Sequence, residues 1–190
     1  HHASPSRITH PPMPPSPRIL IAGLGNELLS DDGVGVHALR ELEQRPMPGV
    51  TTADVGTAVL HGLHFLETAD RVLVIDAAKG GQPPGTVYLF DAAENAEARA
   101  VASVHAMGLR EAARLLMTDR PAPRITVIGV EPETLAYGMS LSAPVRAALP
   151  GVVALARETV AGWQTPAEPA TRTAPPASSL APLCPISAAT

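Results

Sequence analysis

The chain of 190 residues contains little cysteine and few aromatic residues, and it lacks a long apolar run. Its one cysteine, Cys184, stands near the C-terminal end, which excludes a disulfide framework, a cysteine-based zinc site and a thiol nucleophile in the central part. No stretch of about 20 apolar residues could cross a membrane, and residues 1–17 contain no apolar core of a secretory signal. We therefore expect a cytoplasmic protein with no membrane segment.

An excess of positive charge is also missing. The chain has 14 Lys and Arg residues against 18 Asp and Glu residues, a formal net charge of −4. Because nucleic-acid-binding surfaces concentrate Lys and Arg, this balance argues against nucleic acid as the main partner. The sequence also contains no Gly-x-Ser-x-Gly elbow, no P-loop and no His-Glu-x-x-His motif, which removes the sequence signals of several hydrolase and nucleotide-binding classes.

Proline is abundant but unevenly placed. Residues 1–17 and 164–190 hold 12 of the 21 prolines, with Ser, Thr and Ala between them. Such segments bury too little apolar surface to offset the entropy of ordering, so we expect both to be disordered. The remaining residues, 18–163, have a length that suits one domain with one core.

Strand and helix patterns alternate along this central part. Buried strands are predicted at 19–22, 50–55, 71–76, 86–90 and 124–130, and helices at 31–45, 60–69, 103–119 and 142–163, the last interrupted at Pro150-Gly151. The alternation predicts an α/β fold, a three-layer α/β/α sandwich with a mixed, mostly parallel five-stranded sheet. The strand at 86–90 follows its predecessor without a helix, so we expect it to be antiparallel.

Two carboxylates and one imidazole stand out by position. Asp32 opens the first helix, Asp76 closes an apolar strand, and His105 lies in the first turn of a later helix. In a parallel-type sheet these positions meet at one edge, where ligands bind. This donor set suits borderline divalent metals such as zinc or nickel. A helix N-terminus also disfavours imidazolium, which predicts a neutral, metal-binding form of His105.

Each residue also has a simpler explanation. The doublet Asp31-Asp32 could merely cap a helix, Asp76 could cap loop amides, and His105 could be a half-buried core histidine. Asp31 is the better cap, which leaves Asp32 unexplained. A carboxylate that ends a run as apolar as Val72–Ile75 needs a partner. The convergence of the three therefore favours a site.

Other polar motifs give weaker evidence of function. The loop Gly23-Leu-Gly-Asn26 resembles part of a dinucleotide fingerprint, but position 28 is leucine where a third glycine is needed. Asp54, at the end of a strand, is the one feature that favours a nucleotide. The histidines His61 and His64 could pair on a metal, with Glu67 nearby, but a solvated helix face explains them better.

The ordered motifs resemble those of the hydrogenase maturation endopeptidases, which cut a C-terminal extension from the large subunit of nickel-iron hydrogenases. The N-terminal signature is Gly23-Leu-Gly-Asn-Glu-Leu-Leu-Ser-Asp-Asp-Gly-Val-Gly35. It is followed, in the family's order, by Asp54-Val-Gly-Thr-Ala58, Val72-Leu-Val-Ile-Asp-Ala77, Pro84-Gly-Thr86, Ser103-Val-His-Ala-Met-Gly-Leu109 and Ile128-Gly-Val-Glu-Pro-Glu133. The resemblance spans about residues 18–163.

The resemblance implies a function and a site. The chain is expected to be a peptidase, aspartic-type or metal-dependent, that processes the large-subunit precursor of a nickel-iron hydrogenase after nickel insertion. Asp32, Asp76 and His105 then correspond to the residues that bind metal and support catalysis. The metal is the nickel of the precursor, for which other divalent metals could substitute, and the free enzyme is expected to be a monomer.

The second motif departs from the family. It commonly reads Asp-Gly-Gly-Thr, whereas this chain has valine at position 55. Valine does not adopt a positive φ cheaply, so position 55 is either extended or lies in a different loop. The resemblance assigns substrate recognition to this motif, on Asp54, Gly56 and Thr57.

Two mechanisms and two other functions remain open. Hydrolysis could use a metal-polarised water or carbonyl group, or Asp32 or Asp76 as the general base for a water molecule. The alternatives to a processing protease are a noncatalytic nickel-binding or nickel-sensing module and a hydrolase similar to peptidyl-tRNA hydrolase. The last lacks its expected Asn-Pro-Gly continuation, since Asn26 is followed by Glu27 and Leu28.

Overall fold

The computed structural model describes residues 16–57, 64–92, 104–116 and 121–165. The strands are β1 (Ile19–Leu24), β2 (Val50–Gly56), β3 (Arg71–Ala77), β4 (Val87–Asp91) and β5 (Arg124–Val130). The helices are the 3₁₀ turn η1 (Ser30–Gly33), α1 (Val34–Glu43), α3 (Val104–Leu116) and α4 (Ala143–Gln164). Most of the residues for which disorder is expected lie outside the described part, so that expectation and the domain limits at 18 and 163 stay predictions.

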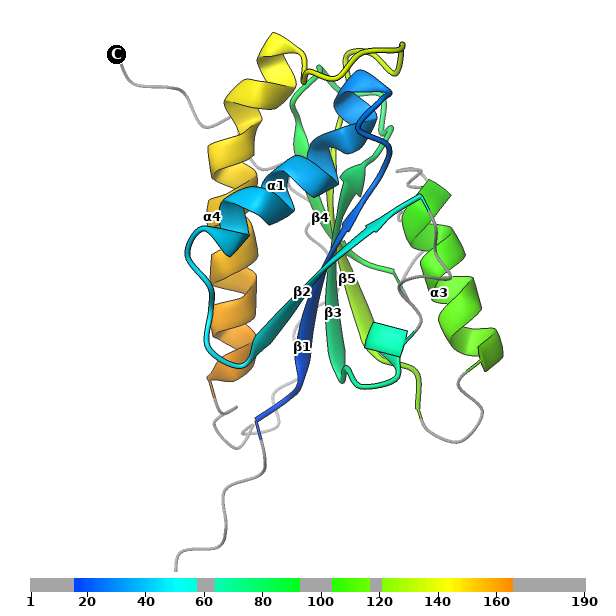
Figure 1. The fold of residues 1–190 in the computed structure, drawn as a ribbon, viewed down its shortest axis with the longest axis vertical. Coiled ribbons are helices and arrows are strands. Elements are labelled where there is room, and N and C mark those ends of the chain that lie inside the picture. Colours follow the sequence, from blue (N-terminus) through cyan, green and yellow to red (C-terminus); the bar gives the residue numbers. More distant parts are fainter. Residues whose placement is uncertain (1–15, 58–63, 93–103, 117–120, 166–190) are drawn as a thin grey trace, which may run out of the picture.

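The five strands form one sheet in the order β2-β1-β3-β5-β4 (Figure 1). The neighbours β2 and β1, β1 and β3, and β3 and β5 pair in parallel, and β4 pairs antiparallel with β5. The predicted mixed, mostly parallel sheet is confirmed, as is the antiparallel strand. Every residue of β1 is buried, which explains why its sequence is continuously apolar.

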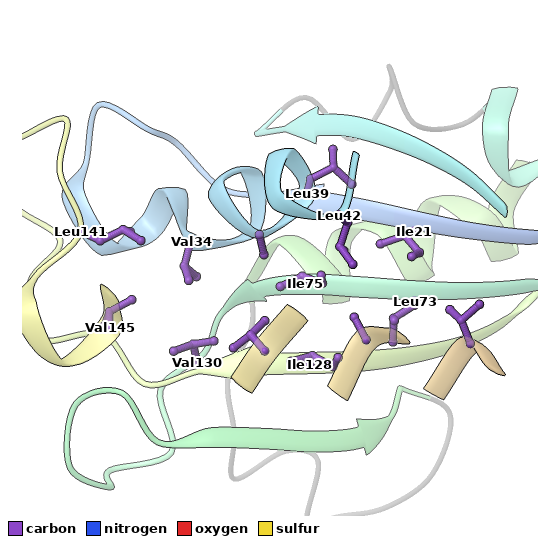
Figure 2. Packing of buried hydrophobic residues seen from close by; sticks show 14 of the residues in the cluster. Ile21, Val34, Leu39, Leu42, Leu73, Ile75, Ile128, Val130, Leu141 and Val145 are labelled. Atoms are coloured by element: carbon purple, nitrogen blue, oxygen red, sulfur yellow. The ribbon is translucent and has the colours of Figure 1, made fainter. Parts of the chain in front are cut away.

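Helices cover both faces of the sheet. Helices α1 and α4 lie on one side and α3 on the other (Figure 1). Side chains of β1 alternate between two cores: Ile19 and Ile21 pack under α1 and α4, and Leu20 and Ala22 pack on the side of α3. Figure 2 shows the first of these cores, in which Leu39 and Leu42 of α1 lie over the strand residues Ile21 and Ile75.

Two helix predictions need correction. The first helix begins at Val34 rather than at Asp31, because residues 30–33 form a separate 3₁₀ turn. The last helix is continuous across Pro150, whereas a break was predicted. Pro150 is exposed, so the backbone bond that it removes faces water. The buried stripe of α4, formed by Val145, Val152, Ala156 and Val160, continues on both sides of it. Of the helix predicted at 60–69, residues 58–63 lie outside the described part and 64–66 are helical.

The start of α1 presses closely against the carboxyl ends of two strands. A Cβ atom at Gly35 would lie 2.1 Å from the carbonyl oxygen of Ile75 and 2.4 Å from that of Leu24. Only glycine allows this approach. It brings the turn that carries Asp31 and Asp32 to the edge of the sheet where β3 ends. None of the described helices is long and apolar enough to cross a membrane.

Candidate functional site

Asp76 is the buried centre of the predicted site. It is the next-to-last residue of β3, and its side chain is 0% exposed. Its Oδ1 atom accepts a hydrogen bond from the backbone N–H of Ala77 at 2.9 Å. The same oxygen lies 3.3 Å from Nδ1 of His105. The expectation that this carboxylate needs a partner is therefore met by an amide and an imidazole.

His105 lies in the first turn of α3, as predicted, and 24% of its side chain is exposed. The hydrogen bond to Asp76 raises the pKa of His105 most, and the negative charges of Asp76 and Asp32 raise it further, while burial lowers it. The prediction that this position keeps the ring neutral is therefore wrong in direction, because the neighbouring carboxylates favour the protonated form. Binding of a metal cation here has to displace the proton of the ring.

Asp32 completes the trio from the 3₁₀ turn. Its Oδ2 atom accepts the backbone N–H of Asn26 at 2.8 Å, which ties the turn to the glycine-rich loop. Its charge acts on His105, so the three predicted residues share one electrostatic environment. Among the described residues, no three or more His, Cys, Asp or Glu side chains are arranged as a ready metal site. The donor types, carboxylate and imidazole, are ones that borderline divalent ions accept.

Asp31 does not cap the first helix, so that prediction is wrong. Helix α1 has Gly33 at its N-cap, without a side-chain cap. The Asp31 carboxylate, 0% exposed, instead accepts three backbone N–H groups from a distant loop. The donors are Glu133 at 2.9 Å, Thr134 at 3.0 Å and Ser142 at 2.7 Å. A partner more than 100 residues away leaves no local signal in the sequence.

The structure explains the valine at position 55 of the second motif. The pairing of β1 with β2 shifts at this point: Gly23 pairs with Asp54 and Leu24 with Gly56, so Val55 is the extra residue of a bulge. Val55 stays in the strand, with its side chain buried, and Gly56 takes the positive φ of 53°. The alternative in which position 55 is extended is therefore the correct one.

A cleft of about 440 Å³ joins the first and second motifs. Its lining includes Asn26 and Leu28 from the first motif, Asp54 and Thr57 from the second, and Met139 from the loop after β5. The three residues predicted for substrate recognition, Asp54, Gly56 and Thr57, all contribute to it.

The sequence patterns missed several residues of this edge. Glu27 and Arg40 form a two-pronged ion pair in the cleft wall, with one N–H···O distance of 2.7 Å, and His37 lies 3.9 Å from the same carboxylate. A spacing of 13 residues across a loop is no helical pattern, so the sequence gives no signal for the pair. Met139 was also missed, because its place depends on the fold of a loop.

Glu131 was matched only as part of the last motif, but it organises a turn. It is 6% exposed, and its Oε2 atom accepts the backbone N–H of Gly80 at 2.7 Å and the hydroxyl of Tyr88. Burial and this hydrogen bond raise the pKa of Tyr88. The carboxylate therefore fixes the turn between β3 and β4.

The remaining histidine predictions have mixed outcomes. His64 is exposed and stacks on Phe65, with ring centroids 3.7 Å apart. His61 lies outside the described residues, so the idea of a metal pair stays untested. His37, on α1, is half-buried beside Glu27.

Comparisons with known proteins identify the family. A family model described as "Hydrogenase maturation protease" matches residues 36–159. The chain is 34% identical over 150 residues to the hydrogenase 2 maturation protease of Escherichia coli. The alignment covers 74% of this chain and 92% of that protein. It is also 34% identical over 157 residues to the hydrogenase expression/formation protein HupD of Rhizobium leguminosarum, covering 79% and 77% of the two chains.

Solved structures give the same result. The hydrogenase maturating endopeptidase HybD from E. coli superposes with a TM-score of 0.66 at 29% identity, covering 76% of this chain and 93% of that chain. The [NiFe] hydrogenase maturation protease HybD from Thermococcus kodakarensis superposes with a TM-score of 0.64 at 30% identity, covering 75% and 98%.

Proposed function

The chain belongs to the hydrogenase maturation protease family, and from this premise we propose how it selects its substrate. A member of this family is a hydrolase, an endopeptidase that cleaves a hydrogenase large-subunit precursor. The two other functions considered from the sequence, a noncatalytic nickel module and a hydrolase similar to peptidyl-tRNA hydrolase, give way to this one. Action in the cytoplasm and a monomeric free enzyme stay predictions.

We propose that Asp32, Asp76 and His105 recognise nickel that is already bound to the precursor. The observation that carries this is the contact between the buried Asp76 carboxylate and His105, with the Asp32 charge acting on the same ring. Two carboxylates and an imidazole are suitable ligands for nickel. An empty precursor would lack this contact and escape cleavage.

The hydrogen bond between Asp76 and His105 defines the form of the ring that would bind. With the proton on Nδ1, the ring donates to Asp76 Oδ1 and presents the lone pair of Nε2 for a metal. Partners of this kind fix the tautomer and raise the basicity of a histidine ligand. Asp32 is held by the Asn26 amide, so its carboxylate is oriented before the precursor docks.

Hydrolysis requires attack by water on the scissile carbonyl carbon, cleavage of the C–N bond, and transfer of a proton to the leaving amine. In one form of the proposal the nickel of the precursor polarises the water or the carbonyl group. In the other, Asp32 or Asp76 accepts the proton of the water and passes a proton to the amine.

We propose that the cleft holds the precursor segment next to the scissile bond. None of the trio lines this cleft, but Asn26, which does, donates its N–H to the Asp32 carboxylate. Asp54, Gly56 and Thr57 lie in its lining, and Asp54 and Thr57 are exposed. The lining carries the carboxylates of Glu27 and Asp54 against the single guanidinium of Arg40. This balance favours a neutral or basic peptide segment over an acidic one.

The test uses a purified large-subunit precursor of a nickel-iron hydrogenase, prepared with and without nickel. After incubation with the protein, mass spectrometry of the precursor determines its C-terminus. We expect a single shortened product only from the nickel-loaded form. Cleavage of both forms at equal rates would contradict nickel recognition, and cleavage of neither would contradict the processing activity.

A further inference from the structure

The buried carboxylate of Asp31 ties two loops together at the mouth of the cleft. One loop is the first motif, and the other is the segment between β5 and α4, here called the 133–142 loop. Both oxygens of Asp31 are used, Oδ2 by the N–H groups of Glu133 and Thr134 and Oδ1 by that of Ser142. Hydrogen bonds from amides to a buried carboxylate are among the strong ones.

Backbone contacts reinforce the connection. The N–H of Ser30 donates to the carbonyl of Gly138 at 2.8 Å, and the N–H of Gly138 donates to that of Leu28 at 3.0 Å. The Ser30 hydroxyl donates to the carbonyl of Ala136 at 3.0 Å. Ser30 has a φ of 51°, a conformation that costs a non-glycine residue energy and persists only where its surroundings hold it.

The loop held in this way presents apolar side chains to solvent. Tyr137 is 92% exposed and Met139 75% exposed, and Leu28, on the facing loop, is 56% exposed. Leu28 and Met139 both line the cleft that also contains Asp54. Single exposed apolar side chains are ordinary, but apolar side chains that gather at one cleft, as Leu28 and Met139 do, mark a surface that another molecule covers. Methionine suits such a surface because its side chain adapts to its partner.

We propose that Asp31 is a positioning residue for substrate binding. It fixes the 133–142 loop so that Met139, together with Leu28 on the neighbouring loop, forms an apolar wall that contacts the precursor. The occupant is the precursor segment next to the scissile bond, since this wall belongs to the cleft that also contains Asn26, whose N–H binds the Asp32 carboxylate. The inference rests on the proposed function. The neighbouring aspartates thus have different roles: Asp31 positions the binding surface, and Asp32 faces the nickel.

The first experiment compares steady-state kinetics on the nickel-loaded precursor. In Asp31→Asn an NH₂ group replaces one acceptor and opposes the loop amides, so we expect KM to rise by about tenfold while kcat changes by less than about threefold. Met139→Ser should raise KM by about threefold alone and add little to Asp31→Asn, because the two residues act through one surface. An unchanged KM in both single variants overturns the inference.

A matched control separates positioning from general stability. Glu131→Gln damages another buried carboxylate that holds a loop, through Gly80 and Tyr88, away from the cleft lining. It should lower the thermal midpoint as Asp31→Asn does, but leave KM within about twofold. An equal rise of KM in Glu131→Gln would reduce Asp31 to a structural role.

A milder variant keeps the test decisive if Asp31→Asn folds poorly. Ser142 has a φ of −58°, which suits proline, so Ser142→Pro deletes the N–H that donates to Asp31 Oδ1, together with a buried hydroxyl that makes no hydrogen bond. We expect it to raise KM and to speed chymotrypsin cleavage after Tyr137, which follows local opening of the loop. Unchanged KM and cleavage overturn the inference. Failure of the wild-type protein to cleave any loaded precursor would overturn the proposed function as well, so the two failures are distinguishable.

Discussion

Asp31 and Asp76 are both fully buried aspartates at one edge of the sheet, yet their surroundings differ. Asp31 accepts three backbone amides and joins two loops. Asp76 accepts the amide of the next residue, Ala77, and faces the ring of His105, a group that can change its charge. A buried carboxylate surrounded by backbone amides is a fixed structural element, whereas one beside an imidazole can take part in proton or metal exchange.

The comparison shows why burial alone does not identify a functional carboxylate. Both side chains are 0% exposed, so desolvation acts on both. What separates them is the chemistry of the partner: amides cannot titrate, and a histidine can. Perturbations of the edge should therefore have different signatures, and the predictions below follow in order of the size of the expected effect.

The largest effect is expected from Gly35→Ala, which should disturb both aspartates together. The new Cβ would lie 2.1 Å from the Ile75 carbonyl oxygen, next to Asp76, and 2.4 Å from that of Leu24. Because the contacts are with backbone, α1 must move away from the sheet, at a cost of about 3 kcal/mol or more. The measurement is urea unfolding.

Gly151→Ala is the matched control for that prediction. A Cβ at Gly151, inside α4, meets nothing within 4 Å. Alanine is favoured over glycine in a helix interior, so this variant should gain about 0.5–1 kcal/mol of stability. Equal stability of the two variants would mean that α1 does not need its close approach to the sheet.

This edge also shows what the sequence can and cannot predict. The strands are predictable because burial on both faces makes their sequences continuously apolar, as in β3. Asp76 and His105 are predictable because a strand end and a helix start place them at one edge. The hydrogen-bond donors to Asp31 are not predictable. A carboxylate at a helix start predicts a local cap, whereas Asp31 instead accepts three amides of the distant 133–142 loop. The continuity of α4 through Pro150 depends on tertiary packing, which a local breaker signal does not contain.

The second-largest effect is expected on catalysis from variants of the pair itself. Asp76→Asn and His105→Ala should each lower kcat/KM for the nickel-loaded precursor by about 100-fold or more, since even the outer partners of metal ligands contribute 10–100-fold. Asn keeps the oxygen that accepts the Ala77 amide, so the fold should persist. Circular dichroism checks the fold, and mass spectrometry follows the cleavage.

The contrast with Asp31 sharpens this prediction. Asp76→Asn should reduce activity with little loss of stability, whereas Asp31→Asn should lower stability and raise KM with kcat nearly unchanged. If the two asparagine variants gave the same pattern, the division between a structural and a functional aspartate would be wrong.

The smallest effect, a shift of pH dependence, follows from the raised pKa of His105. The hydrogen bond to Asp76, followed by the charges of Asp76 and Asp32, favours the protonated ring. Nuclear magnetic resonance titration of the ring should therefore give a midpoint above the ordinary value of 6.5. Asp76→Asn should lower that midpoint more than Asp32→Asn, because it removes both the charge and the charged acceptor. The reverse order would mean that Asp32 is the closer partner.

The same shift has opposite consequences for stability and for processing. Because the folded pKa is above the unfolded one, the protonated ring stabilises the fold fully below pH 6.5, and this contribution disappears as the pH rises through the folded pKa. Nickel binding needs the neutral ring, so processing should fall by up to about tenfold per pH unit as the pH drops below the folded pKa. The difference in thermal midpoint between wild type and His105→Gln, measured across pH, follows the first effect, and cleavage rates follow the second. A cleavage rate that stays flat from about pH 5 to 8 would contradict ligation by His105, because protonation would then have no effect on the site.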